Sequence, residues 1–455
     1  MGFEAFNWSL RVTLANFSLG LVVFACKPLE IVAVDAPSQI NDEANQNLIT
    51  YSSHVGKIFS ENCISCHADG EIAPFALDNY EDASDRAAWI LNSISRRSMP
   101  PSNVDNSGKC NQFTNARWLP DSDIEVIRQW VNSGAKRGSV TYRAPDSVTP
   151  TSLSRNDHQL AMEGFYTPSD ATSDEYRCFF LNQPIVSGAN KMVGFEVLPG
   201  DVPSVHHAIL MTFDSDAAVS LARVQDAADT EMGFSCFGGV TGTQSVGVWA
   251  AGGAPFEYAG NKGFEIPYGR PLLVQVHYFT GNGVKPDLTK INLKLSSDAE
   301  QVSMFFVTSL GIDIPKGVAS HKVEGNLIAG IPVTSAGKLL IPPGLEVELL
   351  AAFPHMHKLG KSAKLKFTKQ GVGGEASADV CLADSPRWNF NWQDTYLYKD
   401  PIVLGPGTWT PHIECVFDST RNWPLDRIAN ITFGEGSQDE MCFYFVHYLI
   451  RASTP

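Results

Sequence analysis

The chain has 455 residues, of which 34 are basic and 49 acidic, so its net charge is −15; 44% of the residues are hydrophobic and 18% are charged. It is too apolar and too poor in charge to be disordered. Its net negative charge argues against nucleic-acid binding, which needs a basic surface. The length predicts about three domains. The nine cysteines are an odd number, so disulfide pairing alone cannot use them all.

An apolar run over residues 12–25 ends at Cys26. It is shorter than the roughly 20 residues of a membrane span, and it has the length of a signal-peptide core. Its end, Val-Phe-Ala-Cys, resembles a bacterial lipobox, in which the cysteine is lipidated. We therefore expect a lipoprotein-type signal peptide (1–26), a tether (27–48) and an exported bacterial protein, periplasmic or at the cell surface, that touches the membrane only through a lipid on Cys26. The alternative is an ordinary cleaved signal with an incidental cysteine, which also leads to export.

Residues 63–67 read Cys-Ile-Ser-Cys-His, the attachment signature of c-type haem. Cys63 and Cys66 would form thioethers to the haem vinyl groups, and His67 would be an axial iron ligand. Met99, which two prolines follow, is the predicted sixth ligand, because a thioether favours reduced iron. The alternatives are that Met99 is a packed loop residue and that His54 is the ligand.

A helix is predicted after this loop. Ser122 and Glu125 have capping-box spacing, an apolar stripe follows, and Gly134 offers a stop. The order of CxxCH, Met-Pro loop and helix resembles a small class I cytochrome c. The resemblance covers residues 49–140 and implies a small all-α cytochrome c domain.

The composition and the hydrophobic pattern of the sequence change after residue 141. A linker rich in Pro, Ser, Thr and Asp is followed by short apolar runs between Gly and Pro clusters, and several of these runs alternate as half-buried strands do. Helical periodicity is scarce. The pattern predicts two all-β sandwiches. The predicted strands include 193–198, 208–213, 272–279, 345–353 and 431–433.

Histidines recur in this β region in a definite order. His206 and His207 are adjacent at the start of one predicted strand, and His277 lies in another. Adjacent residues point to opposite faces of a regular strand, so both can bind one metal only at a strand end or a bulge. His355 and His357 are two apart and share one face. Met441 adds a thioether, and two imidazoles with a thioether favour copper.

The order His-His, Val-His-Tyr, His-Met-His-x-x-Gly and Asp-Glu-Met-Cys resembles the type II copper monooxygenases. The resemblance covers roughly residues 150–455 and implies two jelly-roll sandwiches with one copper each, in 141–305 and 306–455. His206, His207 and His277 would hold the electron-transfer copper. His355, His357 and Met441 would hold the copper that activates O2 for hydroxylation of a C–H bond.

Electrons in that family usually come from ascorbate. Here we expect the haem to relay electrons to the copper sites from ascorbate or a redox protein. Family members that amidate peptides have an arginine where this chain has Phe353, and polar residues where it has Phe443 and Phe445. A small apolar or aromatic substrate is therefore expected, since a buried carboxylate would lack partners. The alternative is that these phenylalanines are core residues.

The remaining six cysteines are even in number. The resemblance pairs Cys178 with Cys236 and Cys415 with Cys442. Cys110 and Cys381 are left, and we expect them to bridge two domains; the alternative is two free thiols. Two other functions stay open: a non-catalytic haem and copper electron-transfer or copper-binding protein, and a structural sandwich with vestigial sites.

Overall fold

The computed structural model describes residues 48–139, 152–169, 174–236, 239–332, 334–371, 377–424, 427–434 and 438–453. The predicted signal peptide, Cys26 and all but the last residue of the predicted tether lie outside these ranges. Residues Ile49–Pro455 form one compact unit. Within the described ranges, no helix combines the length and apolar character that crossing a membrane requires.

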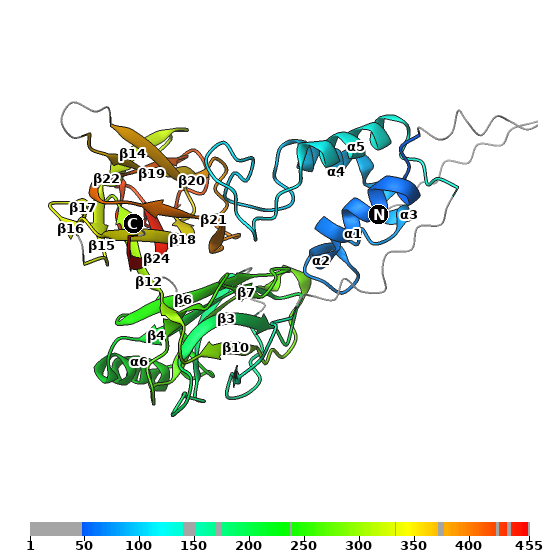
Figure 1. The fold of residues 1–455 in the computed structure, drawn as a ribbon. Helices are drawn as coiled ribbons and strands as arrows, with labels where there is room; N and C mark the ends of the chain where they lie inside the picture. The colour runs from blue at the N-terminus through cyan, green and yellow to red at the C-terminus, as the bar shows by residue number, and fades with distance from the viewer. Residues whose placement is uncertain are drawn as a thin grey trace, which may run out of the picture. The chain divides into compact units, whose positions relative to one another are not determined.

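The first part of this unit, in blue and cyan in Figure 1, consists of short helices around one apolar core. Phe59, Ile127 and Trp130 are almost completely buried in that core. The predicted final helix forms, but its predicted capping box does not: Pro120 is the N-cap, and Ser122 hydrogen-bonds to Asp123 instead. The elements are η2 (Tyr51–Val55), α1 (Gly56–Asn62), α2 (Ile64–His67), α3 (Tyr80–Asp85), α4 (Ala87–Ser95) and α5 (Asp121–Asn132).

Two sheets follow, and both contribute to one apolar cluster; we call them the first sheet pair. One sheet has the order β1-β10-β3-β8-β11, with β7 paired to β3, and the other has the order β5-β2-β9-β4-β6. The strands are β1 (His158–Ala161), β2 (Asp174–Leu181), β3 (Lys191–Leu198), β4 (Val205–Phe213), β5 (Phe234–Ser235), β6 (Thr243–Ala250), β7 (Phe256–Glu257), β8 (Lys262–Glu265), β9 (Leu272–Phe279), β10 (Lys290–Ser296) and β11 (Glu300–Gln301), with helix α6 (Asp216–Ala228) after β4 and the short helix η3 (Thr280–Asn282) after β9.

Two more sheets share a second cluster and form the second sheet pair. Their orders are β15-β12-β24-β18-β21 and β16-β17-β22-β19-β20, with β14 paired to β22; β13 and β23 form a small separate ladder. The strands are β12 (Ser303–Thr308), β13 (Asp313–Ile314), β14 (His321–Gly325), β15 (Leu327–Ala329), β16 (Thr334–Ser335), β17 (Lys338–Ile341), β18 (Leu345–His355), β19 (Gly360–Lys369), β20 (Ala378–Ser385), β21 (Tyr396–Leu404), β22 (Gly407–Phe417), β23 (Ile431–Thr432) and β24 (Phe443–Ala452).

The expected fold class, an all-α cytochrome c domain followed by two jelly-roll sandwiches, is wrong as a description of this structure. The described residues are mostly β, with four main sheets and only 15% helix, and an N-terminal all-α cytochrome c domain is not confirmed. One physical reason lies between α4 and α5. Residues of that non-helical stretch hydrogen-bond to the second sheet pair, as Thr114 does through its N–H to the Leu397 carbonyl.

Three disulfides join the six cysteines that the sequence left for pairing. They are Cys110–Cys381, Cys178–Cys236 and Cys415–Cys442, with Cα–Cα distances of 5.3, 5.7 and 5.9 Å. Disulfides persist in oxidising compartments, so these three indicate an exported or extracellular protein.

A buried histidine joins the two sheet pairs. His447 on β24 is 2.7 Å, through Nδ1, from the hydroxyl oxygen of Tyr258, which follows β7. The ring of Phe264 packs edge-on against the imidazole at 4.9 Å. Burial lowers the pKa of His447 to about 3.

We expect His447 to make the folded protein sensitive to acid. Between about pH 3 and 6.5, the unfolded chain binds a proton at this position and the folded chain does not, so the free energy of unfolding falls as the pH falls. The slope from this histidine alone is about 1.4 kcal/mol per pH unit. The difference in unfolding free energy between the wild type and His447→Gln should therefore shrink as the pH falls below 6.5, measured by denaturant unfolding.

Tyr258→Phe is the matched control for this prediction. It removes the hydrogen bond but leaves the imidazole in place, so it should lower the unfolding free energy and keep the pH slope of the wild type. If the difference in unfolding free energy between the wild type and His447→Gln is independent of pH between 4 and 7, His447 is not the source of the acid sensitivity.

Candidate metal centres

Three histidines from two neighbouring strands of the first sheet pair meet at one point. His206 and His207 lie on β4 and His277 on β9, and each offers a ring nitrogen within 4.8 Å of the others. Their exposed fractions are 7%, 2% and 1%. The Nδ1 atoms of His207 and His277 are 3.2 Å apart. The Nδ1 of His206 is buried and has no hydrogen-bond partner in the described part of the chain.

A backbone irregularity brings the adjacent histidines together. The β4–β9 pairing shifts register between Val205 and His207, and His207 then lies directly opposite His277. A regular strand would send two neighbouring side chains to opposite faces. The shift at His206 is the kind of bulge that lets two adjacent side chains share one metal.

Neighbouring groups on β2 orient His277. Its Nε2 lies 2.9 Å from a carboxylate oxygen of Asp174 and donates to it, which leaves Nδ1 as the lone-pair nitrogen facing His207. The ring of Tyr176 stacks on the imidazole at 4.2 Å, with an interplanar angle of 1°. A metal-binding histidine typically donates its other N–H in this way.

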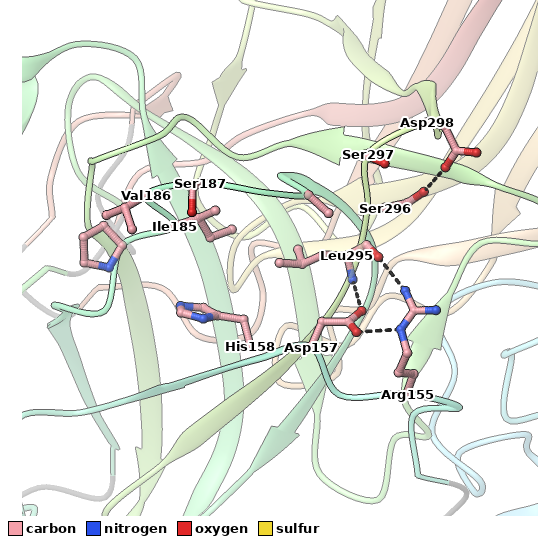
Figure 2. A pocket seen from close by; sticks show the side chains of 12 residues that line it. Arg155, Asp157, His158, Ile185, Val186, Ser187, Leu295, Ser296, Ser297 and Asp298 are labelled. Carbon is pink, nitrogen blue, oxygen red and sulfur yellow. Dashed lines mark hydrogen bonds and ion pairs between the residues drawn. The ribbon is translucent and has the colours of Figure 1, made fainter.

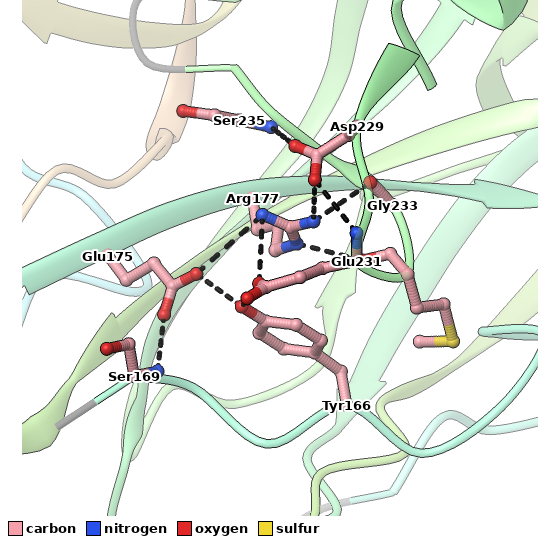
Figure 3. A network of polar contacts seen from close by, with 9 residues as sticks. Tyr166, Ser169, Glu175, Arg177, Asp229, Glu231, Gly233 and Ser235 are labelled. Carbon is pink, nitrogen blue, oxygen red and sulfur yellow. Dashed lines mark hydrogen bonds and ion pairs between the residues drawn. The ribbon is translucent and has the colours of Figure 1, made fainter. Parts of the chain in front are cut away.

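The strand that carries these two residues is held by a buried ionic network (Figure 3). Arg177 lies next to Tyr176 and donates to Asp229 at 2.9 Å and to the Met232 carbonyl at 2.8 Å. A buried guanidinium with charged and carbonyl partners fixes its strand firmly. Arg177 therefore stabilises the position of Asp174 and Tyr176 beside the histidines.

The electrostatics favour neutral imidazoles in this cluster. Burial lowers the pKa of His206 to about 3, and burial followed by the neighbouring histidines lowers the pKa of His207 well below its usual value. Burial also lowers the pKa of His277, although Asp174 opposes the shift. At neutral pH the rings need not lose a proton before they bind a metal.

The second candidate centre lies where β18 ends. The rings of His355 and His357 are 5.3 Å apart. The Nδ1 of His355 donates to the side-chain oxygen of Gln393 at 2.6 Å, and the Nδ1 of His357 to the Asp439 carbonyl at 3.0 Å. Both contacts leave Nε2 as the nitrogen that would bind a metal. Burial, then His357, lowers the pKa of His355 to about 3.

Glu440, the residue before Met441, hydrogen-bonds to the backbone beside this centre. The carboxylate oxygens of Glu440 accept hydrogen bonds from the backbone N–H groups of His357 at 2.8 Å and Leu359 at 2.6 Å. Burial raises the pKa of Glu440 to about 8. Cys442, bonded to Cys415, anchors the other side of Met441. The structure thus places Met441 between two fixed residues, one of which contacts the His-Met-His turn.

The phenylalanines flagged in the sequence lie beside this centre. Phe353 faces Phe445 and His355 faces Phe443 in the β18–β24 register. The rings of Phe353 and Phe445 are 5.7 Å apart, and those of Phe443 and Phe445 are 5.5 Å apart. Phe445 lies 6.4 Å from the ring of His355. The surroundings of this histidine on the sheet are therefore aromatic and carry no charge from these residues.

The CxxCH residues occupy helix α2 and its N-cap. Among the described residues, Cys63 and Cys66 are the cysteines outside disulfides. The Nδ1 of His67 donates to the Phe75 carbonyl at 3.0 Å, so Nε2 would be the iron ligand. Burial raises the pKa of Cys63 to about 12, so this thiol stays protonated.

A cavity of about 1200 Å³ lies next to these residues. Ile64, Ser65 and Ala68 line one part of it, and Pro100, which follows Met99, lines another. Met99 is 38% exposed. The rival ligand His54 is partly buried and lies 2.9 Å, through Nδ1, from the hydroxyl of Ser53. Cys63, Cys66, His67 and Met99 do not themselves line this cavity, although their chain neighbours do.

A smaller pocket of about 550 Å³ lies elsewhere in the first sheet pair (Figure 2). Arg155 and Asp157 form an ion pair at its edge, and Arg155 also donates to the Leu295 carbonyl. Its polar groups are engaged with one another, and none of the candidate metal ligands lines it. We assign it no role.

The fold and the two centres define a mostly β protein with two clusters of potential metal ligands. One has three imidazoles, and the other has two imidazoles whose turn is hydrogen-bonded to Glu440, the residue before Met441. Residues 333–454 match the family described as "Copper type II ascorbate-dependent monooxygenase, C-terminal domain". The matched range contains His355, His357 and Met441. Because that family uses copper, the match supports a copper-dependent oxidoreductase.

The other comparisons add no functional information. No protein of curated function matches the chain. Among solved structures, the VP2 subviral particle of infectious bursal disease virus has 11% identity and a TM-score of 0.17, covering 67% of this chain and 75% of its own. The structure of the Gx strain of the same virus has 9% identity and a TM-score of 0.16, and the match covers 67% of this chain and 75% of that chain. These TM-scores are too low to indicate a shared fold.

Proposed function

We propose that the protein is a copper monooxygenase that uses O2 to hydroxylate a C–H bond of a small apolar or aromatic substrate. The observation that carries the proposal is the pairing of a buried, neutral histidine trio with a second histidine pair inside the matched range. The orphaned Nδ1 of His206 supports a metal at the trio, because a buried polar atom without a partner is otherwise costly.

The two centres would have different tasks. His206, His207 and His277 would hold one copper through three imidazoles, a set suited to electron transfer. His355, His357 and Met441 would hold the other, and copper bound there supplies the activation of O2. The Phe353, Phe443 and Phe445 rings would hold an apolar substrate near that centre and keep water from it. Residues 141–305 and 306–455 are the proposed limits of the two copper-binding parts.

The proposal includes a haem bound covalently at Cys63 and Cys66, with His67 and Met99 as its axial ligands. The cavity beside Ile64, Ser65, Ala68 and Pro100 and the hydrogen bond from His67 to Phe75 support this assignment. The haem would supply one-electron redox chemistry, with ascorbate or a redox protein as the external donor. We also keep the proposal of a bacterial lipoprotein anchored through Cys26.

The composition of the purified protein tests these assignments. Full-length protein, matured in a host that attaches haem c and then loaded with copper, should contain two coppers and one haem. His277→Ala should lose one copper and keep the haem. A wild type that binds no copper would contradict the monooxygenase proposal, and one without haem despite haem attachment to a control cytochrome would contradict the haem assignment.

A further inference from the structure

One segment links the CxxCH part of the chain to the second sheet pair. We call residues 102–116, which lie between α4 and α5, the strap. Its Cys110 is bonded to Cys381 on β20, and its Phe113 forms a β-bridge with Tyr398 on β21. Backbone hydrogen bonds from Asp105 to Asp384 and from Lys399 to Gln112 add to this attachment. The strap is therefore fixed along the edge of that sheet pair.

Asn103 of the strap is 1% exposed and uses its whole side-chain amide on one loop. Its Nδ2 donates to the carbonyls of Asn389 at 3.2 Å and Trp392 at 2.9 Å. Its Oδ1 accepts from the Asn389 N–H at 2.8 Å. An asparagine amide offers two N–H groups and one oxygen, so these contacts occupy both of its functional ends. We call residues 388–394 the clasped loop.

The clasped loop contacts both histidine centres through adjacent residues. The side-chain oxygen of Gln393 accepts from His355 at 2.6 Å, and the Gln393 amide donates to the Phe390 carbonyl. The ring of Trp392 lies 4.8 Å from the ring of His206. One short loop thus orients a ligand candidate in each centre, although the two histidines lie on different sheet pairs.

A second contact joins this loop to the His-Met-His turn. The indole N–H of Trp388 donates to the His357 carbonyl at 3.0 Å. The ring of Phe390 lies 6.3 Å from the His357 ring. A shift of the loop would therefore disturb contacts of His206, His355 and His357 together. Hydrogen-bonding partners of metal ligands tune metal affinity by about 10- to 100-fold.

We propose that Asn103 is a positioning residue for both metal centres and that it acts through the clasped loop. It touches no ligand candidate itself; it fixes the backbone that presents Trp392 to His206 and Gln393 to His355. The inference rests on the proposed function, because it takes both centres as copper sites. The strap, which lies between the CxxCH part of the chain and helix α5, would then set the geometry of both coppers.

The test compares Asn103→Ala with Asn115→Ala in the full-length, copper-loaded protein. Asn115 is a matched control, because it also joins the strap to the second sheet pair with two hydrogen bonds, to Thr395 at 2.7 Å and from Leu397 at 2.8 Å. Those partners lie outside the clasped loop. The measurements are the Cu(II) electron paramagnetic resonance spectrum and the copper dissociation constant by chelator competition.

Asn103→Ala should change the Cu(II) hyperfine splitting and weaken copper binding by about 10-fold or more. Asn115→Ala should keep the wild-type spectrum and bind copper within about twofold of wild type. If Asn103→Ala fails to fold, Asn103→Asp replaces it in the test. Aspartate has nearly the same shape but loses both N–H contacts, so the same changes in the spectrum and in copper binding are expected. Two coppers with an unchanged spectrum in the Asn103 variant would overturn the positioning role, whereas a wild type without copper would count against the proposed function instead.

Discussion

Replacing Met441 with alanine is expected to reduce hydroxylation by about 100-fold or more, because the substitution removes a ligand and the loss of a mere supporting partner already costs about 10- to 100-fold. The copper at His206, His207 and His277 should remain, since Met441 lies outside that cluster. The expected result is therefore a protein that keeps one copper and its haem but forms almost no product. Product formation at saturating substrate and the copper content are the two measurements.

Met304→Ala is the control for this prediction. Met304 is a partly buried methionine on β12, in the same sheet as β24, and pairs in register with His447. Its loss should cost some stability and leave turnover within a few-fold of wild type. A Met441→Ala protein that hydroxylates at the wild-type rate would contradict the role of the Met441 thioether as a copper ligand.

Removal of the Cys110–Cys381 disulfide is expected to cause the largest loss of stability. The two cysteines are 271 residues apart, and closing so long a loop restricts the unfolded chain strongly. In the chain-entropy description, the loss is roughly 5 to 6 kcal/mol of unfolding free energy. The measurement is denaturant unfolding of Cys110→Ser/Cys381→Ser, with copper content recorded beside it, because the freed strap carries Asn103.

The comparison for this disulfide is Cys415→Ser/Cys442→Ser. That bridge closes only 27 residues, so its entropic contribution should be smaller by about 2 kcal/mol. Its loss should nevertheless reduce hydroxylation more, because Cys442 follows Met441 directly. A long-range bridge whose removal costs less unfolding free energy than removal of the short one would contradict this ordering.

The order of the histidines in the sequence predicted many of the candidate metal ligands. Adjacent His206 and His207 implied a backbone irregularity, and the register shift in β4 supplies it. Residues 272–279 form β9 as predicted, because the run is apolar throughout and ends at a turn. The spacing of His355 and His357 predicted that both lie on one face of a strand, whereas β18 ends at His355 and His357 follows it. Sequence alone singled out these positions as ligand candidates because metal ligands combine rare residue types at short spacing.

Several supporting residues gave no such signal. Asn103, Gln393 and Asp174 are single polar residues in loops or at a strand start, and only long-range folding brings them to the centres. Helix α6 was not expected among β runs, although Ser215 caps it by accepting from the Ala218 N–H. Its stripe of small residues, such as Ala218 and Ala222, is a weak periodic signal.

The predicted fold class was wrong for a related reason. The CxxCH motif indicates haem attachment, but it contains no information on whether its helices fold as a separate domain. The stretch between α4 and α5 lacks periodicity, and its backbone hydrogen bonds reach partners such as Asp384 and Leu397, more than 250 residues away. Counting cysteines predicted the Cys110–Cys381 bridge, but local pattern does not reveal hydrogen bonding over such a separation. The expectation of an all-α cytochrome c domain therefore rested on short motifs and on the resemblance.

The incorporation of oxygen from isotope-labelled O2 tests the central claim most directly. Copper-loaded protein with an electron donor should be screened against small apolar and aromatic compounds, and each hydroxylated product analysed by mass spectrometry. We expect one labelled oxygen atom per product, formed only when substrate and reductant are both present. Copper-loaded wild-type protein that yields no labelled product from any of these compounds would contradict it and favour an electron-transfer or copper-binding protein without turnover.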